Sequence, residues 1–560
     1  MTQPTAARSW RASGVVCVVL VALALALPWF SLFDHPIWPP EEGRYGQVAA
    51  RMVNTGDWLV PYFEGRAHLT KPPLAYWAQA MGLEMFGRGP LALRLPSALA
   101  TSVVVLGLVL LGWLVKRPMA GVCAALLFAV LPLTMVAGRL AAPDALLNML
   151  WFGSLVGGLL ACHGGATGWR RVAWLVLFWG SAGLACMAKA PLGAAPVVIV
   201  CTWLVVMRQW RALARLGWWW GVPLMLAPCG VWVWLIYQGH PDVLATMWEQ
   251  SVGRVTGDLG KHDPWWTYIP VFLLGLWPAT TMLTLPGFNF SWRNTWARLT
   301  QDPVCTLMVV AVVGPLCVFS ISAGKLPHYL LPVAAPLAFL IGMMLEGQMR
   351  PAAALGSSTD RPPDVRFTYL ASVALGMAGC MVAAALAPPE LGAHWWWGLV
   401  LVPAFAGALW LVWVWWDRQR RTAALVVAWL GMACTWYLAL ECEDHIFDRL
   451  CAHQLTDVVA EVSHQNGRLL VLADDDTTRA FYYGPHVVEL GRLPRSIRQA
   501  VEHLRPGDLL LVEDRLLPDV RAALASSGWA EDPAWPPRPF VLLWTTHATV
   551  LRPVRAGPQG

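Results

Sequence analysis

The chain contains 560 residues, of which 57% are hydrophobic and only 13% are charged, and 35 of them are Trp. Soluble domains usually contain about 25% charged residues, and Trp concentrates where a membrane meets water. This composition indicates a membrane protein. It excludes a disordered chain, a coiled coil and a soluble nucleic-acid-binding protein, so no nucleic-acid partner is expected.

The apolar residues are grouped in long segments. A helix needs about 20 mostly apolar residues to cross a bilayer, and thirteen segments of about that length follow one another. The first segment follows basic residues as a signal peptide does, but its length and the lack of a polar cleavage region favour a retained anchor. The sequence therefore predicts an all-α polytopic membrane protein. The predicted spans are residues 13–33, 96–115, 118–137, 145–162, 172–188, 191–207, 216–236, 266–285, 303–321, 329–346, 368–387, 395–416 and 423–440.

The positions of Lys and Arg predict the orientation of these spans. If the N-terminus is cytoplasmic, seventeen Lys and Arg residues lie in the cytoplasmic loops. The short outer loops then hold only Arg139, Lys189, Arg254, Lys261 and Lys325. Because cytoplasmic loops are enriched in Lys and Arg, this orientation is favoured over its inverse. With an odd number of spans, the C-terminus is expected on the outer side.

The first outer loop, residues 34–95, is long, and loops of this length are usually functional. Pro40 is placed to start a helix that carries Glu41 and Glu42. Acids favour the first turn of a helix, but a glutamate pair at the mouth of a membrane bundle is also what a glycosyl-transfer or metal site would use.

Lys71 precedes a second predicted helix in this loop. A cation at a helix N-terminus is disfavoured by the helix dipole, so a phosphate group is an obvious partner for Lys71. The alternative is a lysine that extends to the lipid headgroups.

Other outer loops add charged groups. Asp144 begins the fourth span, where it could cap the helix or take part in chemistry. Arg254 and His262 precede the eighth span, and Lys325 and Tyr329 precede or begin the tenth. Cations and acids thus gather on one side, which suggests a site for an anionic lipid headgroup beside carboxylates.

Residues 446–560 have the composition of a soluble domain, whereas residues 1–445 form the predicted transmembrane domain. Cys442 and Cys451 are predicted to lie just outside the last span on the outer side, where they could form a disulfide. Alternating strands and helices predict a small α/β domain. The predicted strands are 468–473, 486–490, 508–513 and 540–545, and the predicted helices are 477–483, 495–504 and 517–526.

Five short motifs resemble those of a known family. Pro-Glu-Glu-Gly-Arg-Tyr at 40–45, Gly-Asp-Trp at 56–58 and Lys-Pro-Pro-Leu-Ala-Tyr-Trp at 71–77 resemble the first-loop signature of bacterial glycosyltransferases of the protein mannosyltransferase and aminoarabinose transferase group. Ala-Ala-Pro-Asp at 141–144 and Gly-Lys-Leu-Pro-His-Tyr at 324–329 resemble its later motifs. The resemblance extends over roughly residues 10–440.

The resemblance implies the membrane C-type glycosyltransferase fold, a cytoplasmic N-terminus and an active site on the periplasmic side of the bacterial inner membrane. It implies transfer of a sugar from an undecaprenyl-phosphate donor to an acceptor, above all lipid A with 4-amino-4-deoxy-L-arabinose, or another surface glycan or a protein. The membrane lipids themselves are further expected partners.

The same resemblance implies roles for individual residues. Glu41 is the first candidate for a catalytic residue and Asp144 the second, and either carboxylate could take the proton of a hydroxyl acceptor. The candidates for binding the donor and its phosphate are Lys71, Arg254, Tyr329, Lys325, Arg44 and Tyr45, and Glu42, Asp57 and His262 are further candidates.

Two departures from the family pattern concern the sugar. Glu41 and Glu42 stand where the family usually has Asp-Glu, and Thr70 stands where aminoarabinose transferases often have Glu. Thr70 removes a carboxylate that could bind a metal or an amino-sugar, so participation of a divalent metal is left open. The resemblance therefore defines the reaction class more firmly than it defines the sugar.

Two other functions compete with sugar transfer. A flippase or transporter of lipid-linked sugars would need ionisable residues within the spans and helices broken near the midplane, and the spans contain few such residues. An O-antigen ligase or polymerase would use the same lipid carriers but would not need the first-loop motifs.

Overall fold

The computed structural model describes two compact units of the chain. The first comprises Met1–Phe30, Ala67–Ala75 and Arg94–Leu438, and the second comprises Ser31–Arg66, Tyr76–Leu93 and Ala439–Gly560. Within them, the described residues are 5–30, 32, 37, 41–63, 66–163, 165–258, 262–283, 301–349, 429, 458, 461–462, 467–472, 487–489, 494–533, 537–542 and 546–555.

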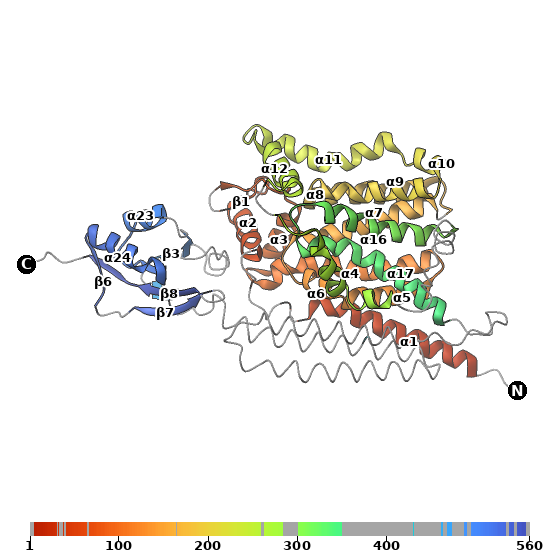
Figure 1. Cartoon of the computed structure of the whole chain (residues 1–560), viewed down its shortest axis with the longest axis horizontal. Coiled ribbons are helices and arrows are strands. Elements are labelled where there is room, and N and C mark those ends of the chain that lie inside the picture. Colours follow the sequence, from red (N-terminus) through yellow and green to blue (C-terminus); the bar gives the residue numbers. More distant parts are fainter. Residues whose placement is uncertain are drawn as a thin grey trace, which may run out of the picture. The chain divides into compact units, whose positions relative to one another are not determined.

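The chain up to residue 349 is mainly helical (Figure 1). Its longer helices are α1 (Thr5–Ala26), α2 (Glu41–Thr55), α3 (Leu74–Phe86), α4 (Pro90–Leu114), α5 (Pro118–Val130), α7 (Pro143–Cys162), α8 (Gly168–Lys189), α9 (Ala195–Val206), α11 (Trp218–Tyr237), α12 (Val243–Thr256), α16 (Pro303–Ile321) and α17 (Leu331–Met349). The shorter elements are η1 (Leu27–Trp29), α6 (Pro132–Ala137), η2 (Leu192–Ala194), α10 (Trp210–Ala214), η3 (Trp265–Thr267), α13 (Tyr268–Gly275), α14 (Ala279–Met282) and η4 (Pro327–Leu330), with the strands β1 (Tyr62–Phe63) and β2 (Arg66–Ala67).

Six helical segments among the described residues are long and apolar enough to cross a membrane, which identifies a polytopic membrane protein. Four shorter apolar helices, Val15–Trp29, Pro118–Val130, Leu192–Val206 and Trp265–Gly275, coincide with four further predicted spans. Ten of the thirteen predicted spans therefore coincide with apolar helices. The last three, from residue 368 onward, lie outside the described residues except for Trp429.

The predicted span 118–137 is divided by proline. Leu131 has an extended backbone, with φ −66° and ψ 133°, between the end of α5 and the start of α6 at Pro132. Proline lacks the N–H that would continue the helical hydrogen bonds, and it disfavours a helical conformation for the residue before it. The apolar pattern predicted the segment correctly but not this break.

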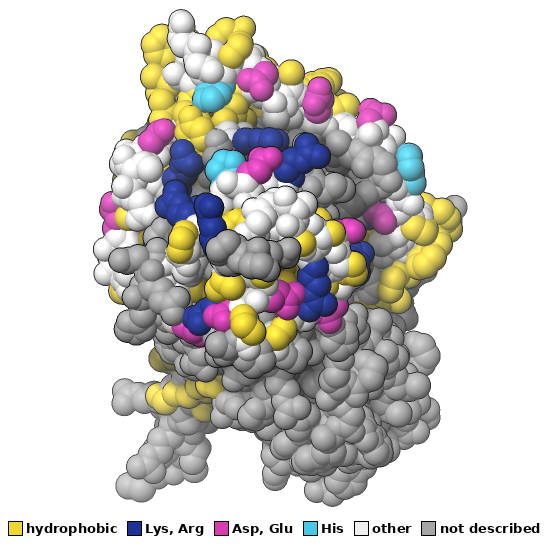
Figure 2. Space-filling model, turned by 90° about the vertical axis from the view of Figure 1, so that its left-hand side faces the viewer, with side chains coloured by type: hydrophobic (Ala, Val, Ile, Leu, Met, Phe, Trp, Pro, Cys, Tyr) yellow, Lys and Arg dark blue, Asp and Glu magenta, His cyan; other side chains and the backbone are white. Residues whose placement is uncertain are grey.

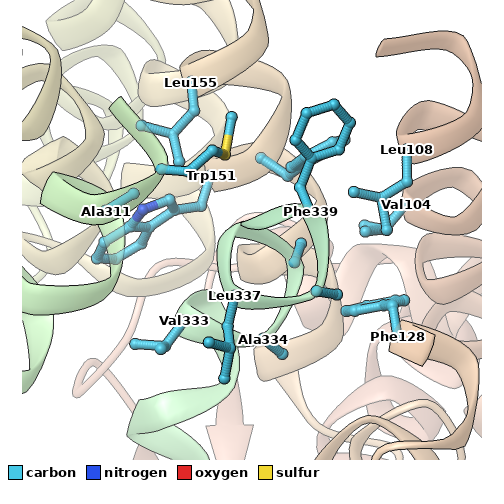
Figure 3. Close-up of a cluster of buried hydrophobic side chains, with 14 of the residues drawn as sticks. Val104, Leu108, Phe128, Trp151, Leu155, Ala311, Val333, Ala334, Leu337 and Phe339 are labelled. Atoms are coloured by element: carbon cyan, nitrogen blue, oxygen red, sulfur yellow. The ribbon is translucent and has the colours of Figure 1, made fainter. Parts of the chain in front are cut away.

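Close helix packing forms the core of the first unit. Figure 3 shows Trp151 of α7 and Phe339 of α17 in the apolar cluster, and both are almost fully buried. At Gly157 of α7, an added Cβ would lie 2.6 Å from the backbone nitrogen of Phe178 in α8. Small residues let membrane helices approach at their backbones, so Gly157 allows the close contact between α7 and α8.

In the second unit, the C-terminal residues contain a five-stranded sheet with the order β4-β3-β5-β8-β7. The strands β4, β3 and β5 are parallel, and β8 pairs antiparallel with β5 and β7. The elements are β3 (Leu469–Leu472), β4 (Val487–Glu489), α23 (Pro494–Glu502), β5 (Leu509–Glu513), η9 (Asp514–Leu516), α24 (Leu517–Ser526), β6 (Trp529–Glu531), β7 (Arg538–Leu542), β8 (Thr546–Leu551) and β9 (Pro553–Arg555).

These C-terminal elements overlap the four predicted strands and two of the three predicted helices. The predicted helix 477–483, together with Cys442 and Cys451, lies outside the described residues. Apolar side chains of β3 and β5, including Leu470 and Leu510, pack with Val501 of α23 and Leu524 of α24 in one buried cluster. The sequence analysis missed β8, which carries Thr and His among its apolar residues.

The surface differs between regions of the molecule. On the face in Figure 2, Lys and Arg side chains are interspersed with Asp and Glu side chains, as is usual for surfaces in water. The candidate span α11 instead exposes large apolar side chains such as Trp219 and Trp234, which are 83% and 74% exposed. This exposure is expected of a helix that faces lipid.

Candidate functional site

Asp144 lies in the first turn of α7. The N-cap of this helix is Ala142, which makes no side-chain capping bond. Asp144 therefore does not occupy the N-cap position, although its negative charge suits the helix N-terminus. Its side chain is only 12% exposed, so this charge requires partners within the protein.

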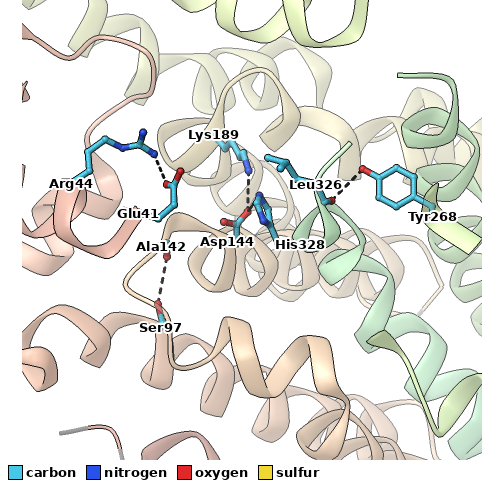
Figure 4. A network of polar contacts seen from close by, with 9 residues as sticks. All are labelled: Glu41, Arg44, Ser97, Ala142, Asp144, Lys189, Tyr268, Leu326 and His328. Atoms are coloured by element: carbon cyan, nitrogen blue, oxygen red, sulfur yellow. Dashed lines mark hydrogen bonds and ion pairs between the residues drawn. The ribbon is translucent and has the colours of Figure 1, made fainter. Parts of the chain in front are cut away.

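The main partner of Asp144 is Lys189, the last residue of α8. The Lys189 Nζ donates a hydrogen bond of 2.9 Å to Asp144 Oδ1, and the Lys189 side chain is also 12% exposed. His328 Nε2 lies 3.8 Å from the same oxygen. Figure 4 shows Lys189 and His328 directed toward the Asp144 carboxylate from different elements.

Tyr329 completes this group, which we call the Asp144 cluster: Asp144, Lys189, His328 and Tyr329. The Lys189 Nζ lies 4.6 Å from the centre of the Tyr329 ring, a cation–π contact that adds to the ion pair. The Tyr329 and His328 rings meet edge to face with centroids 5.0 Å apart. The cluster thus joins the ends of α7, α8 and η4 in the first unit.

Lys71 also contributes to the electrostatic environment of Asp144. It is half-buried in the bend that precedes α3. Three residues that the sequence predicted as site residues, Lys71, Asp144 and Tyr329, are therefore brought near one another. Their surroundings contain cations and hydrogen-bond donors suited to an anionic group.

Lys325 has a different environment from the one expected of a phosphate ligand. It is 7% exposed, and its Nζ donates to the backbone oxygens of Asp263, at 3.1 Å, and Ser322. The ammonium group of Lys325 is therefore bonded to backbone oxygens of the protein. Nothing in the sequence distinguished Lys325 from the other outer cations, because its burial depends on the folding of two distant loops.

The remaining outer candidates are only partly described. Arg254 lies in the last turn of α12, and its side chain is outside the described part of the structure. His262 is exposed and precedes Asp263 in the loop after α12. The predicted roles of Arg254 and His262 therefore stay predictions.

In the second unit, α2 begins at Glu41, as the preceding prolines predicted. The Glu41 side chain is 56% exposed and forms an ion pair with Arg44 one turn later, shown in Figure 4. Burial lowers the pKa of Arg44, but the nearby Glu41 and Tyr45 outweigh this and raise the pKa above its ordinary value. Arg44 is therefore cationic at any physiological pH.

Tyr45 stacks on Tyr76 of α3, with ring centroids 5.0 Å apart and planes inclined by 27°. Burial is the main cause that raises the pKa of Tyr76 well above its ordinary value, and the adjacent Tyr45 adds to it, so the Tyr76 hydroxyl stays protonated. This aromatic pair attaches α2 to α3 and holds the turn that carries Glu41 and Arg44.

Two further acidic candidates in the first loop have different environments. Glu42 is 1% exposed, so its side chain is buried. Asp57 Oδ1 accepts hydrogen bonds from the backbone N–H groups of Leu59, at 3.1 Å, and Val60, at 3.3 Å. This pattern is typical of an aspartate that stabilises a turn, and it gives Asp57 a structural function.

The sequence analysis missed Lys189 and His328 as site residues. Lys189 was recognised as an outer cation, but Asp144 is 45 residues away, and no local pattern relates the two. His328 belongs to the motif at 324–329, so its position beside Tyr329 could have suggested it. Among the described residues, no group of three or more His, Cys, Asp and Glu side chains is arranged to hold a metal ion.

Residues 70–234 match the family described as dolichyl-phosphate-mannose-protein mannosyltransferase. The chain is 30% identical over 376 residues to the undecaprenyl phosphate-alpha-4-amino-4-deoxy-L-arabinose arabinosyl transferase of Pseudomonas savastanoi pv. phaseolicola, covering 65% of the chain and 66% of that relative. It is 32% identical over 317 residues to the enzyme of the same name from Edwardsiella ictaluri, covering 54% and 55%. The matches thus span less than two thirds of the length of either relative.

The fold is similar to that of a solved structure. ArnT from Cupriavidus metallidurans, bound to undecaprenyl phosphate, superimposes with a TM-score of 0.78 and 21% sequence identity, over 98% of this chain and 100% of that one. The family match includes Lys71, Asp144 and Lys189, and the structural similarity extends over nearly the whole chain. In sequence and in fold, the chain is thus similar to the C-type membrane glycosyltransferases of the protein mannosyltransferase and aminoarabinose transferase group.

Proposed function

We propose that this protein transfers a sugar from an undecaprenyl-phosphate-linked donor to an acceptor at the outer face of the bacterial inner membrane. The proposed sugar is 4-amino-4-deoxy-L-arabinose, by analogy with the names of the relatives. The proposed acceptor is lipid A, as the resemblance of the sequence motifs implies. The observation that supports this best is the Asp144 cluster, because it gathers cations and an ionised carboxylate where the family motifs meet.

The reaction breaks the bond between the sugar C1 and the phosphate oxygen of the donor. A new bond then joins C1 to an acceptor oxygen, and undecaprenyl phosphate leaves with the bonding electron pair. Negative charge develops on the departing phosphate, so Lys71, Arg254 and the Tyr329 hydroxyl are the proposed groups that stabilise it. Arg44 and Tyr45 are proposed to help bind the donor.

The acceptor determines what the acids do. A lipid A phosphate is already ionised and needs no base, whereas a hydroxyl acceptor must lose a proton. Asp144 already accepts a hydrogen bond from Lys189, so we assign it to orienting cationic groups. Glu41 is more exposed, and we assign it to taking the proton or to stabilising positive charge that develops on the sugar.

The proposed architecture has thirteen spans and a cytoplasmic N-terminus. Residues 1–445 form the transmembrane domain and residues 446–560 a soluble periplasmic α/β domain. The sheet β4-β3-β5-β8-β7, with α23 and α24, supports the α/β fold of this second domain.

This topology predicts the location of reporter fusions. Fusions after Arg117, Arg171 and Arg421 are expected in the cytoplasm, because Lys and Arg are concentrated in cytoplasmic loops. Alkaline phosphatase fused after Gly467 is expected to be active, because that enzyme requires the periplasm. An inactive fusion at Gly467, with the same fusion active after Arg117, would contradict the orientation.

The proposed function is tested in cells by mass spectrometry of lipid A. Cells that produce the protein and its lipid-linked donor are expected to contain lipid A with an added aminopentose. Cells that lack the protein are expected to contain only unmodified lipid A. Identical lipid A in both, with the protein present in the membrane, would contradict the proposed acceptor.

A further inference from the structure

Two loops of the first unit are joined by backbone hydrogen bonds. One follows α12 and the other links α16 to η4. The N–H of Ala323 donates to the Val255 oxygen at 3.0 Å, and the N–H of Asp263 donates to the Ala323 oxygen at 2.9 Å. Segments at least 60 residues apart in the chain are thus held together at Ala323.

Lys325 adds three more bonds to this junction. Its backbone N–H donates to Asp263 Oδ2 at 2.7 Å. Its Nζ donates to the Asp263 backbone oxygen at 3.1 Å and to the Ser322 backbone oxygen. Asp263 therefore contacts Lys325 through both its side chain and its backbone, and Lys325 contacts both loops.

Lys325 needs these hydrogen bonds because its charged side chain is buried. A buried ammonium group is costly unless its N–H groups are hydrogen-bonded, and Lys325 is 7% exposed. The two backbone carbonyls satisfy two of its three donors. Loss of the ammonium would leave both carbonyls without this donor, and the loops would separate more easily.

The bonded segment Ala323–Leu326 lies directly before His328 and Tyr329, two members of the Asp144 cluster. The Tyr268 hydroxyl, in α13, donates to the Leu326 oxygen at 3.3 Å, as Figure 4 shows. His328 and Tyr329 follow within three residues. The chain from Ala323 to Leu326 is hydrogen-bonded at several points. These bonds restrict the positions that His328 and Tyr329 can take relative to the rest of the Asp144 cluster.

We propose that Lys325 is a positioning residue: with Asp263 it clamps the two loops and thereby places His328 and Tyr329 in the Asp144 cluster. It does not bind the donor phosphate. The effect on catalysis rests on the proposed function, whereas the clamp itself can be measured without any activity.

Hydrogen exchange of the full-length protein in lipid nanodiscs tests the clamp. Lys325→Met keeps the length of the side chain and removes its donors, and Asp263→Ala removes the acceptor of the Lys325 N–H. In either variant, the amides of Asp263, Ala323 and Lys325 are expected to exchange at least about tenfold faster. Asp263→Ala also serves if Lys325→Met does not fold. Lys116→Met, which removes an exposed lysine, is the matched control and should leave these amides unchanged.

Kinetics distinguish the clamp from a phosphate ligand. For a clamp, both variants lower kcat by a similar factor, and the double variant is little worse than either, because residues in one network act non-additively. For a phosphate ligand, Lys325→Met alone raises the KM for the donor. Exchange rates within about twofold of wild type in both variants, or that isolated KM effect, would overturn the proposal. Wild-type protein without transferase activity would overturn the proposed function and leave the exchange test of the clamp intact.

Discussion

Asp144→Asn is expected to destabilise the protein and to remove most sugar transfer. The substitution leaves the Lys189 ammonium, 12% exposed, without its carboxylate. Removing one partner of a buried ion pair typically costs about 3 to 5 kcal/mol. Thermal unfolding in detergent and turnover of a lipid-linked donor measure the two effects.

A double variant separates these two effects. Asp144→Asn with Lys189→Met leaves no uncompensated charge, and replacing a whole buried pair is often neutral for stability. We therefore expect unfolding close to that of wild type but turnover at least about 100-fold lower, as for loss of groups that act on the reacting charges. Wild-type turnover by the double variant would show that the pair is only structural.

Glu41→Gln is expected to lower turnover by about 100-fold or more with a hydroxyl acceptor, because a positioned base usually contributes about that much. The fold should be unaffected, since Glu41 is 56% exposed and an ion pair one helical turn apart contributes only about 0.2 to 0.5 kcal/mol. The measurement is kcat with a hydroxyl acceptor and with a phosphate acceptor.

The control for Glu41→Gln is Glu84→Gln, which neutralises another exposed glutamate in the second unit. It should leave kcat unchanged. If Glu41→Gln impairs transfer to both acceptors equally, Glu41 stabilises charge on the sugar. If it retains turnover within about twofold for both acceptors, Glu41 has no catalytic function.

Much of the fold could be predicted because membrane helices need long apolar segments. The described residues contain helices at the first ten predicted spans. What the pattern missed was the interruption of these helices, as at Leu131 and Pro132. The hydropathy pattern shows where apolar residues are concentrated. It does not show where a proline removes a backbone hydrogen bond.

The candidate site was less predictable, because its geometry depends on contacts between distant segments. The motifs identified Asp144 and Tyr329, but not that Lys189 would lie between them. They also grouped Lys325 with the phosphate ligands, although its ammonium is bonded to backbone oxygens. A lysine has the same charge in either role, and only the fold around it distinguishes the two.

The most direct test of the proposed function uses the purified protein in liposomes with lipid A and undecaprenyl-phosphate-linked aminoarabinose. Mass spectrometry should detect lipid A carrying the sugar, together with an equal amount of free undecaprenyl phosphate, and the Asp144→Asn/Lys189→Met variant should form little of either. An intact donor that only moves across the bilayer would contradict sugar transfer and identify a lipid-linked sugar transporter.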